Sequence, residues 1–157
     1  MGWASCPPTV YAFLKFALRS QSCKPYIGDL RLWIPQYNQY TYPDVLVIDG
    51  KPIFQTQLTD TILNPCLIVE VLSKSTQNHD RTDKFRYYRS ISEFQEYVLI
   101  NQYEIGIEHY RKTEDDTWLF CAYESDQDKM FLGSINYFPS SPAKIASEQN
   151  APLTSGE

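Results

Sequence analysis

The sequence predicts an α/β protein of the α+β type, with a central mixed β-sheet flanked by helices and a C-terminal β-hairpin extension. The apolar run 67–72 has the length and composition of a buried strand. A helical pattern follows from Asp80, and the next apolar run, 98–100, comes at the distance expected for a helix that crosses back over a sheet. The later runs 105–110 and 118–123 flank an acidic turn and predict a hairpin.

The first half of the chain predicts one helix and two strands. Apolar residues from Thr9 to Leu18 recur at helical spacing, and residues 30–34 alternate as in a half-buried strand that ends at Pro35. A second apolar run, 45–48, is closed by the turn signal Asp49-Gly50. The other expected segments are the loops 36–41 and 51–63 and a last short strand near 135–138.

Length and charge limit the function. A chain of 157 residues predicts a single domain, here 1–138, and the composition of 139–157 indicates a flexible tail. The net charge is −5 and there is no dense Lys/Arg block, which argues against strong non-specific binding to nucleic acid. A local basic face could still guide a phosphate; it consists of Lys74, Arg81, Lys84, Arg86 and Arg89.

Cysteine spacing and hydropathy exclude two further classes of protein. The four cysteines are scattered without a CxxC pair, so no zinc site is predicted, and Cys66 is expected to pack in the core. No apolar run reaches membrane-spanning length, and Lys15 and Arg19 interrupt the N-terminal apolar segment, so neither a membrane span nor a signal peptide is expected. We therefore expect a cytoplasmic protein.

One charged residue interrupts the buried strand 67–72. A carboxylate at Glu70 costs several kcal/mol unless a cation meets it. Asp44 follows Pro43 at the start of another buried strand, and Lys84 lies on the helix after Glu70. Two carboxylates and a lysine predict a compact site for a divalent cation, and hard oxygen ligands favour Mg²⁺ or Mn²⁺.

The order of these residues is specific. A Pro-Asp pair is followed by an acid in a strand, by the polar loop that starts at Ser73, and by Asp80 and Lys84 four residues apart. This order, over about 23–138, resembles the bacterial restriction-endonuclease-like family, an outlying branch of the PD-(D/E)XK nuclease superfamily. The resemblance implies a restriction-endonuclease-like core and a metal-dependent endonuclease that hydrolyses phosphodiester bonds of DNA.

The resemblance also implies roles for particular residues. Asp44 and Glu70 match the metal ligands, with the backbone carbonyl of Val71 completing the set. The superfamily lysine is expected two residues after the acid, but Leu72 stands there, and Lys84 takes the matching place on the helix. Family members usually carry an N-terminal segment before the helix 9–18, often with an acid near the active site. The sequence lacks it, which leaves open whether the site is active.

Several neighbours are expected to support this site. Asp80 is predicted to begin the helix as its N-cap and to hold Lys84, while Tyr88 either binds phosphate or packs on the sheet. Ser73 is expected to satisfy backbone donors in its loop, or else to orient Glu70 or a metal-bound water. The two histidines are not assigned to the site: His79 is expected to be solvated, and His109 lies in an outer hairpin strand with no suggested partner.

Two other classes of function stay open. The chain could be an inactive nuclease-like binding or regulatory module, which its acidic charge favours. It could also be a structural homo-oligomer whose aromatic surface contacts partners. A homodimer is compatible with the sequence, which does not determine the oligomeric state.

Overall fold

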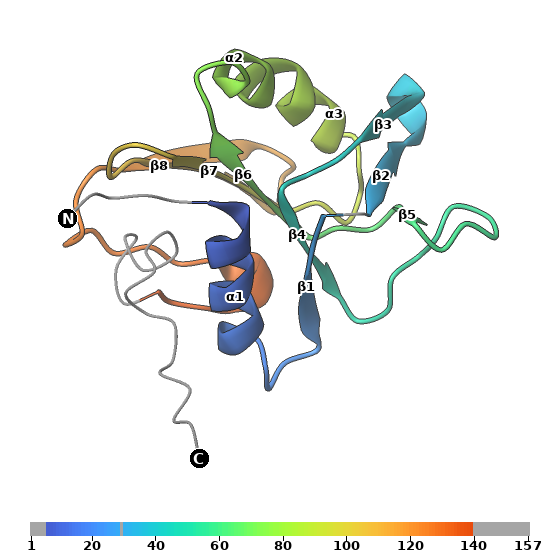
Figure 1. Cartoon of the computed structure of the whole chain (residues 1–157), viewed down its shortest axis with the longest axis horizontal. Helices are drawn as coiled ribbons and strands as arrows, with labels where there is room; N and C mark the ends of the chain where they lie inside the picture. The colour runs from blue at the N-terminus through green and yellow to red at the C-terminus, as the bar shows by residue number, and fades with distance from the viewer. Residues whose placement is uncertain (1–5, 29, 140–157) are drawn as a thin grey trace.

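A six-stranded mixed sheet forms the centre of the protein (Figure 1), which a computed structural model describes for residues 6–28 and 30–139. The strand order is β1-β4-β6-β7-β8-β9. Neighbours β6 and β7 are parallel, and the other neighbours are antiparallel. The strands are β1 (Cys23–Ile27), β4 (Val45–Asp49), β6 (Leu67–Leu72), β7 (Glu96–Asn101), β8 (Ile107–Lys112) and β9 (Trp118–Tyr123).

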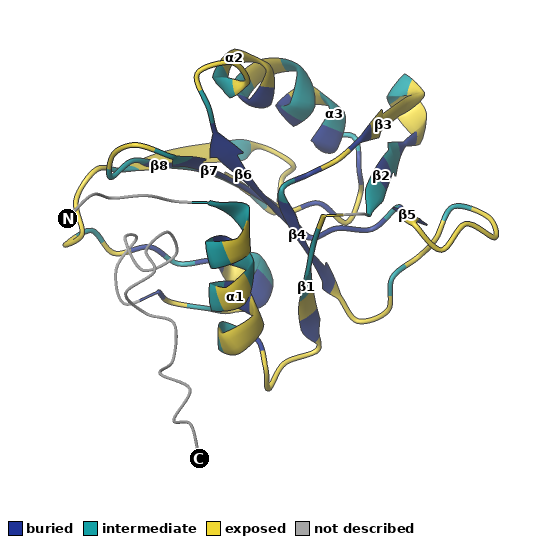
Figure 2. Cartoon of the chain, in the orientation of Figure 1, coloured by how far each residue is buried: buried dark blue, intermediate teal, exposed yellow. Residues whose placement is uncertain are grey.

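Helices cover both faces of this sheet. Helix α1 (Pro7–Ala17) lies on one face, and the other face carries α2 (Gln77–His79), a π-helical turn η2 (Asp80–Lys84) and α3 (Phe85–Tyr88). Because neighbouring side chains of a strand point to opposite faces, β4 and β6 contribute to both cores and are buried throughout, apart from the end of β4 (Figure 2).

A second, three-stranded sheet has the order β3-β2-β5. It consists of β2 (Arg31–Ile34), β3 (Gln39–Thr41) and β5 (Thr61–Ile62). Leu32 and Ile34 are buried in the same core as α3, so the inner face of this small sheet packs on the α3 side of the molecule. A short 3-10 helix, η1 (Pro35–Tyr37), connects β2 to β3.

The predicted mixed sheet, its flanking helices and the hairpin extension are confirmed, but several local predictions are wrong. Strand β1 was missed because it contains Pro25, which an edge strand tolerates. Strands β3 and β5 lie within predicted loops, since burial of Thr41 and Ile62 overrides the polar composition of their surroundings. The expected strand near 135–138 is instead a 3-10 helix, η3 (Gly133–Ile135), with one isolated bridge between Leu132 and Tyr137.

Helix α1 begins at Pro7, two residues before the predicted start, because proline is well suited to a first helical turn. None of the helices in the described ranges is long and apolar enough to cross a membrane. The predicted tail, apart from Pro139, lies outside the described residues.

Candidate active site

Glu70 is buried in the middle of β6. Its residue surface is 1% exposed, and its side chain shares a face with Ile68, toward α2 and α3. Burial, opposed by the positive charge of Lys84 and reinforced by the carboxylates of Asp44 and Asp80, raises the pKa of Glu70 to about 8. A carboxyl group with this pKa is largely protonated at neutral pH unless further positive charge approaches it.

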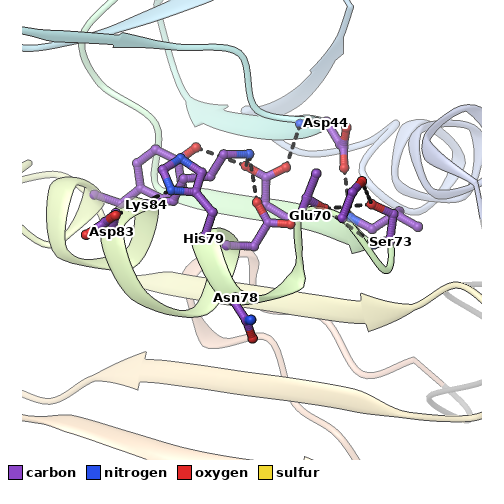
Figure 3. A network of polar contacts seen from close by, with 12 residues as sticks. Asp44, Glu70, Ser73, Asn78, His79, Asp83 and Lys84 are labelled. Carbon is purple, nitrogen blue, oxygen red and sulfur yellow. Dashed lines mark hydrogen bonds and ion pairs between the residues drawn. The ribbon is translucent and has the colours of Figure 1, made fainter.

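Three donors hold the Glu70 carboxylate in place (Figure 3). Its Oε1 accepts hydrogen bonds from the Tyr88 hydroxyl at 2.9 Å and from Lys84 Nζ at 3.2 Å. Its Oε2 accepts the backbone N–H of Asp44 at 3.1 Å. Burial raises the pKa of Tyr88 well above its usual value, so the phenol keeps its proton and remains a donor. The orientation of Glu70 is therefore fixed from both sides.

Asp44 lies where β4 begins, next to β6. The last paired residues are Val45 and Val69, so Asp44 and Val71 lie just beyond the antiparallel ladder. Oδ2 of Asp44 accepts the backbone N–H of Val71 at 2.8 Å. The N–H and C=O of one strand residue point to the same side, so the carbonyl of Val71 is directed toward the Asp44 side of β6. These oxygens therefore converge beside Glu70.

Lys84 and Asp80 both belong to the π-helical turn η2. Lys84 Nζ lies 2.8 Å from Oδ1 of Asp80, so the amine bridges Asp80 and Glu70. Burial lowers the pKa of Lys84, but the two carboxylates raise it by more, so its net shift is upward and the amine stays charged. The predicted N-cap role of Asp80 is wrong, because Asp80 is 2% exposed and lies inside the helical segment that begins at Gln77.

Two hydroxyl groups accompany the wide turn. The Thr82 hydroxyl donates to the carbonyl of Asn78 at 2.7 Å, and the Tyr97 hydroxyl donates to the carbonyl of Asp80 at 2.8 Å. In each case a side-chain hydroxyl donates a hydrogen bond to a backbone carbonyl of the helical segment. The sequence analysis missed Tyr97, because no local pattern shows that a tyrosine on β7 reaches a helix carbonyl.

A pocket of about 260 Å³ lies over these groups. Three acids and one lysine line it together with the loop after β6; the lining residues are Pro7, Asp44, Glu70, Val71, Ser73, Thr76, Asp80, Lys84 and Gln102. The predicted catalytic residues and the predicted supporting residues Asp80 and Ser73 thus share one solvent-accessible pocket. Its lining therefore carries three carboxyl groups and one amine, so oxygen ligands outnumber the single cationic side chain.

Comparison with known proteins identifies the family. The family model described as "Uma2: Putative restriction endonuclease" matches residues 8–134. The chain belongs to the Uma2 family.

Two curated relatives come from Synechocystis sp. and share this Uma2 chain's sequence over part of their length. "Uncharacterized protein sll1609" is 45% identical over 94 residues, covering 60% of the chain and 53% of that relative. "Uncharacterized protein slr1290" is 39% identical over 109 residues, covering 69% of the chain and 55% of that relative. The matched parts therefore span about half the length of these relatives.

Two other residues considered in the sequence analysis of this Uma2 chain make no hydrogen bond or ion pair with Asp44, Glu70 or Asp80. The Ser73 hydroxyl is hydrogen-bonded to Thr76 at 2.9 Å and to Ser75 at 3.1 Å, so it organises its own loop. The side chain of His79 is 52% exposed and pairs with Asp83 at 3.6 Å, and His79 is not among the residues that line the pocket. The solvated position expected for His79 agrees with this exposure.

The predicted basic face is largely paired. Arg81 makes an ion pair with Glu108 at 2.8 Å, and Arg86 pairs with Asp83 at 3.5 Å. Arg89 and Lys74 lie over the rings of Phe85 and Tyr103. Of the five basic residues, Lys84 alone lines the described pocket. Of the four basic side chains outside the pocket, Arg81 and Arg86 are thus paired with carboxylates, whereas Arg89 and Lys74 keep their charge beside aromatic rings.

A second buried polar pair was missed by the sequence analysis. His109 Nε2 lies 2.6 Å from Oε2 of Glu96, and these side chains are 4% and 1% exposed. Oε1 of Glu96 also accepts the backbone N–H of Ser134, which ties η3 to β7. The expectation that His109 has no partner is wrong, because its partner lies on the neighbouring strand. The pair lies on the α1 face, opposite Glu70.

Replacing His109 with phenylalanine is expected to lower the free energy of unfolding by about 3–5 kcal/mol, since Glu96 then loses its buried partner. Urea denaturation followed by circular dichroism measures this change. His79→Phe is the matched control, and its effect should stay within about 0.5 kcal/mol because His79 is exposed. Equal losses for the two variants contradict a stabilising pair.

Proposed function

We propose that this protein is an endonuclease that uses Mg²⁺ or Mn²⁺ to hydrolyse phosphodiester bonds of DNA. The observation that supports this most is the buried carboxylate of Glu70, placed in a pocket beside Asp44 and bridged to Lys84. The order of these residues and the membership in the Uma2 family agree with this assignment.

The oxygen atoms in the pocket suit a divalent cation that is coordinated partly by the protein and partly by a phosphate of the substrate. Asp44, Glu70 and the carbonyl of Val71 supply the ligands in this proposal, all of them oxygen atoms. Among the described residues, no group of three or more His, Cys, Asp or Glu side chains is arranged to hold a metal ion. Two carboxylates suffice for Mg²⁺, which usually keeps several waters and binds substrate phosphates. When bound, such a cation polarises the phosphodiester and lowers the pKa of an attacking water.

The remaining side chains of the site place a positive charge near the phosphate and hold Glu70 and the loop in position. Lys84 stabilises negative charge that develops on the phosphate, and Asp80 keeps its amine in place at 2.8 Å. Tyr88 holds Glu70 in a single orientation through its hydrogen bond at 2.9 Å. Ser73 shapes the loop that borders the pocket. A π-helical turn that carries both Asp80 and Lys84 is in keeping with this assignment, because such turns are frequent at functional sites.

Purified protein with MgCl₂ or MnCl₂ is expected to cut at least one of three substrates: supercoiled plasmid, linear duplex or single-stranded DNA. Titration calorimetry should show binding of the same ions without DNA, and chelation should remove both signals. Asp44→Asn should weaken ion binding because it removes one of the two carboxylates. Absence of cleavage of every form together with absence of ion binding would overturn the proposal.

The main alternative is a nuclease-like module that binds without cutting. The raised pKa of Glu70 favours it, because a protonated carboxyl group is a poor metal ligand. DNA binding without cleavage and without ion binding would identify this case. Sedimentation distinguishes the nuclease and the binding module from a structural homo-oligomer and shows whether the protein is a homodimer.

The proposed location of the protein is the cytoplasm. The four free cysteines suit this reducing compartment.

A further inference from the structure

Exposed aromatic side chains lie on the small sheet and directly after its strand β3. Tyr40 is 44% and Tyr42 is 59% exposed. Trp33 pairs with Tyr40 across strands β2 and β3, and their ring centroids lie 4.4 Å apart. Ile53, Phe54 and Leu58 are also exposed near this sheet, so about half of the large exposed apolar side chains of the described residues belong to this one region.

A guanidinium group extends the same surface. Arg31 lies with its guanidinium carbon 4.8 Å from the centroid of the Tyr40 ring. Its charge is shared with Asp60 at 3.6 Å. We call Arg31, Trp33, Tyr40 and Tyr42 the aromatic strip. Flat aromatic faces beside a guanidinium suit stacking with planar, electron-rich rings.

The aromatic strip leads directly into the candidate active site. Tyr42 precedes Asp44 by two residues, so their Cα atoms lie within about 7 Å of each other. Tyr40 precedes Asp44 by four residues, which limits its distance to about 14 Å. Successive stacked bases are about 3.4 Å apart, so the strip reaches nucleotides one to four positions from a phosphate at the pocket.

We propose that the aromatic strip binds unpaired bases of a DNA strand whose neighbouring phosphate lies at Lys84, so that the preferred substrate has a single-stranded segment beside the cut. This inference rests on the proposed nuclease function. Stacking requires bases that are not already paired, and it is worth roughly 1–3 kcal/mol per base. A duplex presents mainly phosphates to a protein surface, and two of the basic side chains that could meet them, Arg81 and Arg86, are already paired with acids.

Binding is best measured apart from cleavage, with EDTA present. Fluorescence anisotropy should show that wild-type protein binds a 12-nucleotide oligothymidine more tightly than a blunt duplex of equal length. Tyr42→Ala and Tyr40→Ala should each weaken single-strand binding roughly 5-fold to 150-fold. Salt should weaken binding only mildly, because few phosphates are neutralised. Phe16→Ala is the matched control: Phe16 is 47% exposed with Arg19 over its ring at 4.1 Å, on α1 beyond the opposite face of the central sheet.

Three results would overturn the inference: duplex bound as tightly as the single strand, equal effects of Phe16→Ala and Tyr42→Ala, or sedimentation showing that Tyr42→Ala dissolves a dimer. The last result would make the strip a protein interface. Tyrosine-dependent binding of oligothymidine without cleavage in Mg²⁺ or Mn²⁺ would reject the nuclease proposal and keep the binding surface. If the protein cleaves plasmid duplex and Tyr42→Ala leaves this cleavage unchanged, the nuclease proposal is kept and the binding surface is rejected.

Discussion

Replacing Glu70 with glutamine is expected to abolish metal-dependent cleavage. It should also remove most of the fall in the free energy of unfolding that the wild-type protein shows between pH 5 and pH 8. Cleavage should fall at least about 100-fold, because the proposed cation loses one of two carboxylate ligands in the described pocket. Glutamine has nearly the same shape, and its amide oxygen still accepts from Tyr88 or Lys84. The backbone N–H of Asp44 loses its acceptor, which costs about 1 kcal/mol.

The pH dependence follows from the raised pKa of Glu70. The folded protein keeps a proton on Glu70 up to about pH 8, whereas the unfolded chain releases it near pH 4.5. Between these values the folded state binds more protons, so the free energy of unfolding falls as pH rises. The full contribution is present below pH 4.5 and is lost by about pH 8, and it amounts to a few kcal/mol. Glu70→Gln lacks this contribution.

Urea denaturation of both proteins at pH 5 and pH 8 measures this difference. Glu114→Gln serves as the control, because Glu114 is exposed in the β8–β9 hairpin loop. The control should follow wild type at both pH values. If Glu70→Gln also follows wild type, the carboxyl group is ionised throughout, and the raised pKa is not a property of the folded protein. A variant that retains full cleavage would reject the ligand role of Glu70.

The sequence predicted the central layers because buried strands such as 67–72 and 98–100 carry their signal locally. It also predicted that Glu70 has a cationic partner, since an acid in an apolar strand needs one. The π-helical turn at 80–84 has no signal in the local sequence, and the hydrogen bond from Tyr97 to the carbonyl of Asp80 comes from a distant strand. Long-range contacts of this kind have no sequence period.

The edges of the fold were harder to predict for the same reason. Strand β1 contains a proline and a lysine, and it exists because β4 offers it a partner across 45–49. The Glu96–His109 pair joins neighbouring strands, and neither residue has a local motif. The aromatic strip was visible only as a high tyrosine content, since Trp33 and Tyr40 come together through the β2–β3 pairing.

Replacing Lys84 with methionine is expected to lower the free energy of unfolding by about 3–5 kcal/mol at pH 8. Methionine keeps the length of the side chain but removes the charge that bridges Glu70 and Asp80, which are 1% and 2% exposed. At pH 5 the loss should be smaller, because Glu70 is then protonated in the folded state. Lys74→Met, a change at an exposed lysine of the adjoining loop, should alter stability by less than about 0.5 kcal/mol.

The same variant tests whether the carboxylates can accept a different cation. Without the amine, Mg²⁺ should raise the melting temperature of Lys84→Met more than that of wild type, since binding to the folded state stabilises it by mass action. The double variant Lys84→Met/Glu70→Gln should recover part of the lost stability and lose this response to Mg²⁺, because a single buried carboxylate remains at Asp80 and the cation has lost a ligand. A loss below about 1 kcal/mol that does not change with pH would mean that Lys84 does not hold the two buried acids together. That outcome would also remove the electrostatic basis for placing a phosphate at this amine.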